Sequence, residues 1–481
     1  MSARHRRSDG SGQAAKRALR SALQGWIAIT LLVFVSVAAI QIRYGRAGFG
    51  LFIQQWAFTN LTIMLAATAL TWLSVGFLLW LLATGRVTAS NALTVLGLFV
   101  VVFLYLNVLR ERFRYGDYQY YIEAATALLE RRPLPDTYLY LPFWAFLLQF
   151  IAALGDQGIL LVLWSLNILA LAGFYLLMQT TLQRYGFTPR LAALVTAFFI
   201  LINAPIQRTL GFVQVNLIVM DLILLAVLWF PRSVWLSALA MALAVHLKTS
   251  PVVLVLAFLL ERDRRWLLAF VASFVVVGAF PLLVNGPGPY GDFLRNSYAL
   301  TQITDTNFHE TSIDSLLRFV NPFFGISAAV TRAVIYALKA VLLAAVILVM
   351  MRAAKNQTFS ASGQRGVFLM NALPALFVLM TLAPPIVWDH HALFIALPAL
   401  VLLATLSTPA EWLWFGLAYT LEFVLPSFDF FPWSFGRLLA PLIFLALIWR
   451  ASQHDRPRSS LPSIEKLLSA WAAETSGRPS K

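Results

Sequence analysis

The sequence predicts an all-α, polytopic membrane protein with about fourteen transmembrane helices. Of its 481 residues, 60% are hydrophobic and 12% are charged, and the mean hydropathy is +0.77. Soluble domains carry about a quarter charged residues. Many apolar runs approach the roughly 18–20 residues that cross a hydrocarbon core of about 30 Å. Because these runs are continuous rather than alternating, we expect helices and not a β-barrel.

Basic residues predict which side of the membrane is cytoplasmic. Residues 1–22 are rich in Lys and Arg, and residues 451–481 are basic as well. We therefore expect two cytoplasmic tails that flank a transmembrane domain over residues 23–450. The net charge of +15 fits topology signals and attraction to anionic membrane lipids, and we expect no nucleic-acid partner. The chain contains no Cys, which excludes disulfides and thiolate metal sites.

The first three predicted spans, about 23–41, 61–84 and 93–109, place the following loop on the outer side. Apolar residues then recur at helical spacing over 118–129, which predicts an amphipathic helix lying in the membrane interface. The next five runs end at a basic cluster, 261–265, that marks the cytoplasm: 141–154, 159–182, 191–205, 215–230 and 234–260. The run 141–154 is short enough to be re-entrant instead.

The remaining runs return the chain to the cytoplasm after a polar outer loop, 285–323. They are 266–284, 324–351, 367–382, 392–406, 412–425 and 435–449. On this topology the Asp117 loop, the 285–323 loop and the Trp388-Asp-His-His391 segment face the same side. An acid, a long loop and two adjacent imidazoles at one membrane face suggest an extracytoplasmic active site.

Asp117 is the strongest candidate for a catalytic carboxylate. Gly-Asp before an apolar helix is also a good N-cap, in which the carboxylate accepts a backbone N–H. The two roles are compatible. Since Asp117 lies near the interface and near cations such as Arg114, we expect it to stay ionised and ready to accept a proton.

Five further residues invite two interpretations each. His390 and His391 either bond backbone at a span's end or take part in chemistry, while adjacent positions are unfavourable for a metal site. Lys248 lies inside an apolar run next to Pro251, where a charge is costly unless it faces a cavity, a ligand or a partner. Its structural alternative is a pair with Asp221 or Glu422. Gln214 and Asn216 are either interhelical hydrogen-bond partners or substrate contacts.

Five motifs, in order along the chain, resemble the polyprenyl-phosphate-sugar-dependent glycosyltransferases of the C superfamily, most closely glycosyltransferase family 87. They are Gly116–Tyr121 with its acid, Tyr138–Pro142, Gly211–Asn216, Leu247–Pro251 and Ala383–His391. Two residues intervene here between Gly211 and Gln214, where the family has Gly-Gln-x-Asn. The resemblance implies a fold like that of the C superfamily, in the plasma membrane of a bacterium, with the active site on the extracytoplasmic side.

The resemblance implies transfer of one sugar, mannose-like or a pentose, from a polyprenyl-phosphate donor to a lipid or glycan acceptor. Asp117 would be the general base, while Lys248 with His390 or His391 would stabilise the departing lipid phosphate. The implied substrate-binding residues are Tyr121, Lys248, Gln214, Asn216, His309 and Arg318. A single carboxylate favours inversion, and no nucleotide motif, cofactor or metal is expected.

Two other functions remain open from the sequence. A transporter or flippase for a lipid-linked sugar would also have many spans and buried charges, although transporters usually show two related halves with matching broken helices. A polymer ligase would use the same carrier with a larger donor, and the long outer loop with His309 and Arg318 is compatible with it.

Overall fold

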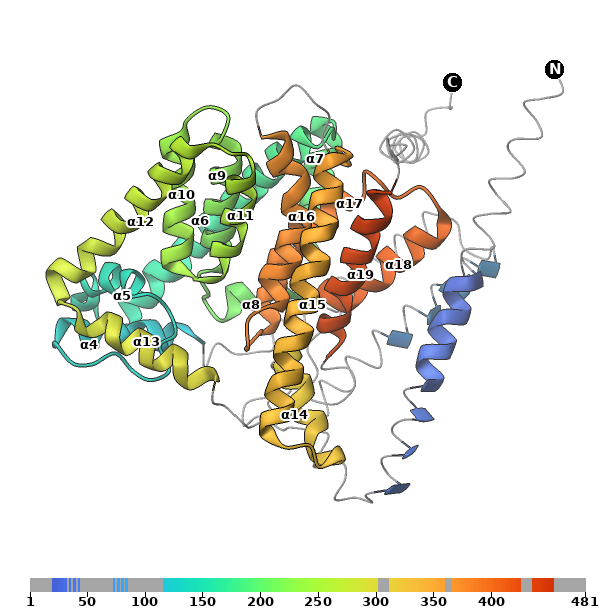
Figure 1. The fold of residues 1–481 in the computed structure, drawn as a ribbon, viewed down its shortest axis with the longest axis horizontal. Coiled ribbons are helices and arrows are strands. Elements are labelled where there is room, and N and C mark those ends of the chain that lie inside the picture. Colours follow the sequence, from blue (N-terminus) through green and yellow to red (C-terminus); the bar gives the residue numbers. More distant parts are fainter. Residues whose placement is uncertain are drawn as a thin grey trace.

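The computed structural model describes residues 116–301, 311–359, 366–424 and 435–453, with parts of 20–43 and 72–84. Within these ranges every regular element is a helix, which confirms the all-α fold class (Figure 1). The α-helices are α4 (Tyr118–Leu129), α5 (Pro142–Gln149), α6 (Gly155–Arg184), α7 (Pro189–Leu201), α8 (Ala204–Gly211), α9 (Asn216–Trp229), α10 (Val234–Leu247), α11 (Val255–Leu260), α12 (Arg264–Asn285), α13 (Gly288–Thr301), α14 (Ile313–Phe324), α15 (Ala328–Lys355), α16 (Val367–Leu382), α17 (Ala396–Leu402), α18 (Pro409–Tyr419) and α19 (Gly436–Ala451). Short 3₁₀ or π turns are η2 (Ala152–Leu154), η3 (Ser250–Leu254), η4 (Asp389–Ile395) and η5 (Thr420–Val424).

In the described ranges, three helical segments are long and apolar enough to cross a membrane: Ala152–Arg184, Arg264–Asn285 and Ala328–Lys355. The pair α7 and α8, bent by 61°, adds a fourth if it is one span, and five shorter apolar helices accompany them. Predicted runs and helices coincide closely, since 367–382 is α16 and 215–230 contains α9. The predicted total of about fourteen crossings stays a prediction, because most of 23–41, 61–84 and 93–109 lies outside the described residues.

Two of the predicted spans are not single continuous helices. Helix α5 has eight residues and is about 12 Å long, which is far short of a hydrocarbon core. The run 234–260 breaks at Lys248, whose backbone is extended with φ −155° and ψ 129°. Near the start of α10, Ser237 donates to the Ala226 carbonyl (2.6 Å) and accepts from the Trp266 indole (2.9 Å). Since Trp266 lies at the start of α12, directly after α11, the segment returns to the end of the bundle where it began.

Two contacts identify the end of the bundle at which each part of the candidate site lies. Helix α6, the α7–α8 pair and α9 lie between α4 and α10 in the chain, and the basic cluster at 261–265 follows α11. We call the end of the bundle that holds this cluster the basic end. Helix α16 begins there, because the Glu261 carboxylate accepts from the Leu369 backbone N–H over 2.6 Å. Helices α4 and α16 thus bring Asp117 and the segment 388–391 to the opposite end.

The predicted polar loop 285–323 contains two helices, α13 and α14, on either side of residues outside the described ranges. On α13, Asp292 accepts from the Leu134 backbone N–H over 2.9 Å, and Asn296 donates to the Pro135 and Tyr138 carbonyls. These buried contacts fix the segment between α4 and α5. Figure 1 shows α4, α5 and α13 gathered at the same end of the molecule.

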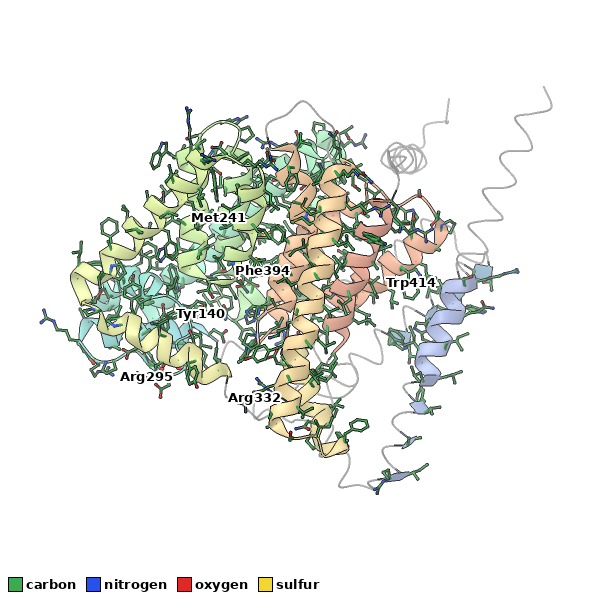
Figure 2. All side chains as sticks on the ribbon, in the orientation of Figure 1. Tyr140, Met241, Arg295, Arg332, Phe394 and Trp414 are labelled. Carbon is green, nitrogen blue, oxygen red and sulfur yellow. The ribbon has the colours of Figure 1, made fainter. Side chains whose placement is uncertain are left out.

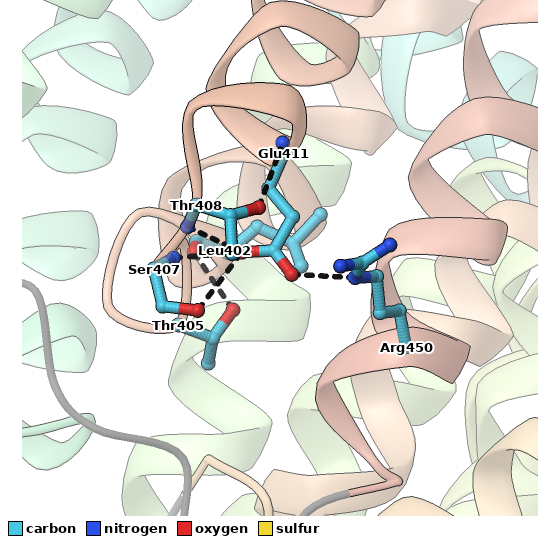
Figure 3. A network of polar contacts seen from close by, with 6 residues as sticks. All are labelled: Leu402, Thr405, Ser407, Thr408, Glu411 and Arg450. Atoms are coloured by element: carbon cyan, nitrogen blue, oxygen red, sulfur yellow. Dashed lines mark hydrogen bonds and ion pairs between the residues drawn. The ribbon is translucent and has the colours of Figure 1, made fainter. Parts of the chain in front are cut away.

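The turn between α17 and α18 is held by a capping box (Figure 3). The Thr408 hydroxyl accepts from the Glu411 N–H (3.3 Å), and the Glu411 carboxylate accepts from the Ser407 and Thr408 N–H groups (2.8 and 2.9 Å). Arg450 of α19 donates to the same carboxylate over 2.6 Å. The sequence Thr-Pro-Ala-Glu is typical of such a box, and it fastens α18 to the last turn of α19.

Candidate active site

Asp117 takes the N-cap position of α4 but makes no capping hydrogen bond with its side chain. Its backbone has φ −63° and ψ −10°, unlike the extended conformation typical of N-cap residues. The capping interpretation is therefore wrong. At the preceding residue, Gly116, a Cβ would lie 2.7 Å from the Tyr118 ring and 3.1 Å from the Phe212 carbonyl oxygen. Glycine thus lets the start of α4 approach the turn before α9.

The environment of Asp117 favours its neutral form more than the sequence suggested. The carboxylate keeps some accessible surface but is surrounded by protein atoms, and this burial raises the pKa of Asp117 from 3.8 to about 7. Lys248 opposes the shift and Asp389 adds to it. The expectation that Asp117 stays fully ionised is corrected, since near pH 7 both forms are populated. Arg114, the cation expected beside it, lies outside the described residues.

Two tyrosines hold Gln214 beside Asp117. The Tyr121 hydroxyl donates to Gln214 Oε1 over 2.9 Å, the Tyr140 hydroxyl lies 3.3 Å from the same oxygen, and the two hydroxyls are 3.1 Å apart. Gln214 is fully buried, and its Nε2 has no hydrogen-bond partner among the described residues. Because the tyrosines fix the amide oxygen, the amide NH₂ is a donor without an acceptor.

The turn 211–216 brings Gln214 and Asn216 into the interior. Val213 has φ 55°, a left-handed conformation that is strained for a β-branched residue. The Gln214 N–H closes the turn on the Thr209 carbonyl over 2.9 Å, and α9 starts two residues later. The two residues that intervene between Gly211 and Gln214 thus form the tight part of this turn.

Lys248 and His390 meet at Asn216. The Lys248 ammonium donates to Asn216 Oδ1 over 2.8 Å, and Asn216 Nδ2 donates to the His390 carbonyl over 3.2 Å. The ammonium also lies 5.7 Å from the ring centroid of Phe394. In Figure 2, Phe394 is labelled near the middle of the molecule, with Tyr140 below it on the left.

The structural partners predicted for Lys248 have other neighbours. The Asp221 carboxylate packs on Gly173 of α6, where an added Cβ would lie 2.5 Å from it. Glu422 lies next to Arg437, whose Nε donates to the Glu422 backbone carbonyl over 3.0 Å. Lys248 is instead held by a neutral amide, so its charge is not cancelled by a direct carboxylate partner in the described residues.

A backbone hydrogen bond determines which ring nitrogen of His391 can donate. Its Nδ1 accepts from the Trp388 backbone N–H over 3.2 Å. A nitrogen that accepts carries no proton, so the neutral ring carries its proton on Nε2. The rings of His390 and His391 meet edge to face with centroids 4.7 Å apart, and His390 is the more deeply buried.

Asp389 lies between two arginines that the sequence did not connect with it. Arg208 of α8 and Arg437 of α19 each approach the same oxygen, Oδ2, to 3.8 Å. All three side chains are largely buried. Arg437 and Tyr140 were absent from the predicted site residues. The sequence signals for them were a charge at the start of an apolar run and a tyrosine within the motif Tyr138–Pro142.

The remaining predicted residues stand apart from this network or outside the described residues. Arg318 of α14 lies 4.0 Å from Asp314, which also pairs with Lys339 of α15. The start of α14 does reach the site, because Thr311 N–H donates to the Val387 carbonyl over 2.7 Å, just before Trp388. His309 lies outside the described residues.

Comparison with known proteins supplies independent information. The sequence pattern of glycosyltransferase family 87 matches residues 138–385, just over half of the chain. A curated relative, the polyprenol-phosphate-mannose-dependent alpha-(1-2)-phosphatidylinositol mannoside mannosyltransferase of Mycobacterium tuberculosis, is 38% identical over 87 residues, which are 18% of this chain. The aligned part spans 20% of that relative's length. No solved structure matches the chain.

Proposed function

The chain belongs to glycosyltransferase family 87, and on that premise we propose that it transfers one sugar, mannose-like or a pentose, from a polyprenyl-phosphate donor to a lipid or glycan acceptor. The relative's printed name, which specifies polyprenol-phosphate-mannose, supports the donor class. The observation that carries the proposal is the convergence of a carboxylate, an ammonium and an imidazole from three distant segments: Asp117, Lys248 and His391.

Asp117 is the general base of the proposed reaction. Its carboxylate takes the proton of the acceptor hydroxyl while the acceptor oxygen bonds to the anomeric carbon. The bond between that carbon and the phosphate oxygen breaks, and the electron pair leaves with the polyprenyl phosphate. Direct displacement inverts the anomeric configuration. A base whose pKa lies near the working pH combines a useful ionised fraction with a strong drive to accept the proton.

Lys248 and the histidines receive the charge that develops on the leaving phosphate. An ammonium held by a neutral amide keeps its attraction for an anion, and the His391 Nε2–H is a second donor. His390 shapes this region from a buried position and takes part through its backbone contact with Asn216. Donors that are fixed before the reaction stabilise the transition state without reorganisation.

We include Gln214 among the substrate-binding residues. Its NH₂ group is buried without a hydrogen-bond partner among the described residues, so contact with a substrate hydroxyl requires the site to open. Its amide oxygen is already occupied by Tyr121 and Tyr140, so the role of Tyr121 is to orient Gln214 next to the substrates. We include Arg318 and His309, from the following outer segment, among the groups that contact the bulkier parts of donor or acceptor.

We place the protein in the plasma membrane of a bacterium, with residues 23–450 as the transmembrane domain and both tails in the cytoplasm. The basic end then faces the cytoplasm and the Asp117 end faces outward. This orientation lets a lipid-linked donor enter from the bilayer, with its phosphate at the membrane surface.

The test is transfer of radiolabelled mannose from a polyprenyl-phosphate donor to a phosphatidylinositol-based glycolipid by purified protein in detergent or liposomes. We expect turnover by the wild type and a loss of about 10²–10⁴-fold in Asp117→Asn. The matched control is Glu123→Gln, which removes an exposed acid on the same helix and should retain activity. Equal turnover in wild type and Asp117→Asn would remove Asp117 from the mechanism. If the wild type is inactive with hexosyl and pentosyl donors alike, the proposed reaction is wrong.

A further inference from the structure

We infer that Asp389 is a positioning residue: held between Arg208 and Arg437, its carboxylate fixes the segment with His390 and His391 next to Asp117 and Lys248. The role rests on the proposed transferase function. Asp389 lies in the middle of the Trp-Asp-His-His segment, and its task differs from that of the general base.

The three charges form a clamp between elements far apart in the chain. Arg208 comes from α8 and Arg437 from the first turn of α19, and both lie 3.8 Å from Asp389 Oδ2. Asp389 and Arg437 are each 6% exposed. Because an uncompensated buried charge is strongly unfavourable, removing Asp389 leaves two buried guanidinium groups without this carboxylate. Removing one arginine leaves Asp389 paired with the other. The guanidinium of Arg208 also lies 5.6 Å from the Phe212 ring centroid, which packs in turn near the His390 ring.

The clamp acts at the point where the backbone enters η4. Asp389 directly precedes His390, and the Trp388 N–H that fixes His391 comes one residue earlier. Other contacts on this stretch include the bonds from Asn216 to the His390 carbonyl, from Thr311 to the Val387 carbonyl and from Ser312 to the Pro385 carbonyl. None of these holds a side chain of η4 against α8 and α19 together. Loss of the clamp therefore frees the imidazoles to shift relative to the phosphate site.

The clamp also determines which charges Asp117 experiences. Within the described ranges, the charged groups that face Asp389 include Arg208 from α8 and Arg437 from α19, with Glu422 of η5 next to Arg437. Helices α16 and α17, which also pack on η4, carry no charged residue. Helix α9 contributes Asn216 and has its Asp221 turned to Gly173, and Lys248 lies beyond Asn216. Asp389 raises the pKa of Asp117, so a neutral residue at 389 should lower that pKa. Loss of the positive charge at 437 should act in the opposite direction by Coulomb's law.

The experiment measures the pH dependence of kcat/KM for Asp389→Asn, Arg437→Gln and the double variant. We expect the midpoint of the acid limb to move by about 0.5–1 pH unit, downward in Asp389→Asn and upward in Arg437→Gln. The double variant should lie between them, and kcat should fall at least about 10-fold in each single variant with a smaller change in KM. The control is Arg450→Gln, which removes an ion pair at the other end of α19 and should leave the midpoint unchanged. Shifts in the same direction, or no shift in either variant, would overturn the positioning role.

A second measurement distinguishes this inference from the proposed function, since it needs no turnover. Thermal unfolding midpoints of the same four proteins form a double-mutant cycle. We expect the double variant to lose less stability than the sum of the two single losses. Asp389→Asn alone leaves both buried arginines without this carboxylate, whereas the double variant leaves only Arg208 without it. Strictly additive losses would show that the three side chains do not act as a clamp, even in a protein that is active. An inactive wild type with coupled losses would instead refute the transferase proposal and retain the clamp.

Discussion

Lys248 donates a hydrogen bond to Asn216 over 2.8 Å, although the two residues come from helices on either side of a turn and lie 32 positions apart. A buried lysine usually requires a carboxylate partner or a ligand. Here a neutral amide orients the ammonium and leaves its charge for another group. The same amide holds the backbone of His390, so the two sides of the site share one anchor.

Asn216→Asp should therefore weaken donor binding. The new carboxylate would pair directly with Lys248 and cancel the charge that is offered to the donor phosphate. We expect KM for the polyprenyl-phosphate sugar to rise about 10-fold or more, which corresponds to one lost charged contact. Asn216→Gln, which retains an amide, is the control for the change of side chain. An unchanged KM in Asn216→Asp would show that Lys248 does not face the donor.

The pH profile of transfer should report the raised pKa of Asp117. A general base acts when it is ionised, so kcat/KM should rise with pH and level off above a midpoint near 7. Removing the positive charge in Lys248→Gln should move this midpoint upward, because Lys248 stabilises the ionised carboxylate. Initial rates between pH 5 and 9 at low donor concentration measure the midpoint. A profile centred near pH 4 would contradict the buried environment of Asp117.

Asp117 should also make folding stability depend on pH, in the opposite direction to its effect on activity. The folded-state pKa of Asp117, about 7, lies above its ordinary value of 3.8, so the folded protein binds the proton more tightly. This contribution is complete below about pH 4 and is lost as pH rises through 7. Since Asn resembles the protonated acid, Asp117→Asn should be more stable than the wild type at pH 8, on the order of 1 kcal/mol after screening at a partly exposed group. Thermal unfolding midpoints of the wild type and Asp117→Asn at pH 5 and 8 provide the comparison. An advantage of Asp117→Asn that is larger at pH 5 than at pH 8 would contradict this prediction.

Two substitutions of His391 should separate its two nitrogens. Asn retains an acceptor near Nδ1 for the Trp388 N–H but lacks the outer donor, while Gln retains a donor near Nε2. If the Nε2–H serves the leaving phosphate, His391→Gln should keep more activity than His391→Asn, which should lose about 10²-fold or more in kcat. The reverse order would assign His391 a purely structural role at the Trp388 backbone.

The tyrosine pair should affect substrate binding through Gln214. Tyr121→Phe and Tyr140→Phe each remove one donor to Gln214 Oε1, at a cost of about 1 kcal/mol in stability per lost hydrogen bond. We expect KM to rise several-fold in each, and more in the double variant, because the amide is then free to rotate. The control is Tyr185→Phe, which removes a buried hydroxyl at the basic end. It tests whether loss of any buried tyrosine hydroxyl raises KM in the same way.

Hydropathy predicted the helices of this chain well, but it did not predict where the backbone breaks and turns back. The runs 215–230 and 367–382 became α9 and α16 because a continuous apolar stretch has to be helical when it is buried in lipid or protein. The same reasoning gave 234–260 as one span, and 141–154 as a span or a re-entrant segment. An apolar run requires apolar surroundings and says nothing of whether its backbone turns back. Ser237 and Trp266 revealed the return of 234–260 only through their contact.

The sequence by itself determined the all-α class, the residues 116–121, 214–216, 248 and 388–391 as candidates, and their common side, because charge and apolarity are properties of the residues themselves. Only the tertiary structure decided what each polar group faces. It gave Lys248 to Asn216 and not to Asp221 or Glu422, freed Asp117 from capping, and enclosed Asp389 between Arg208 and Arg437. These pairings join residues up to 181 positions apart, and the ionisation of a buried acid depends on which charges the fold brings to it.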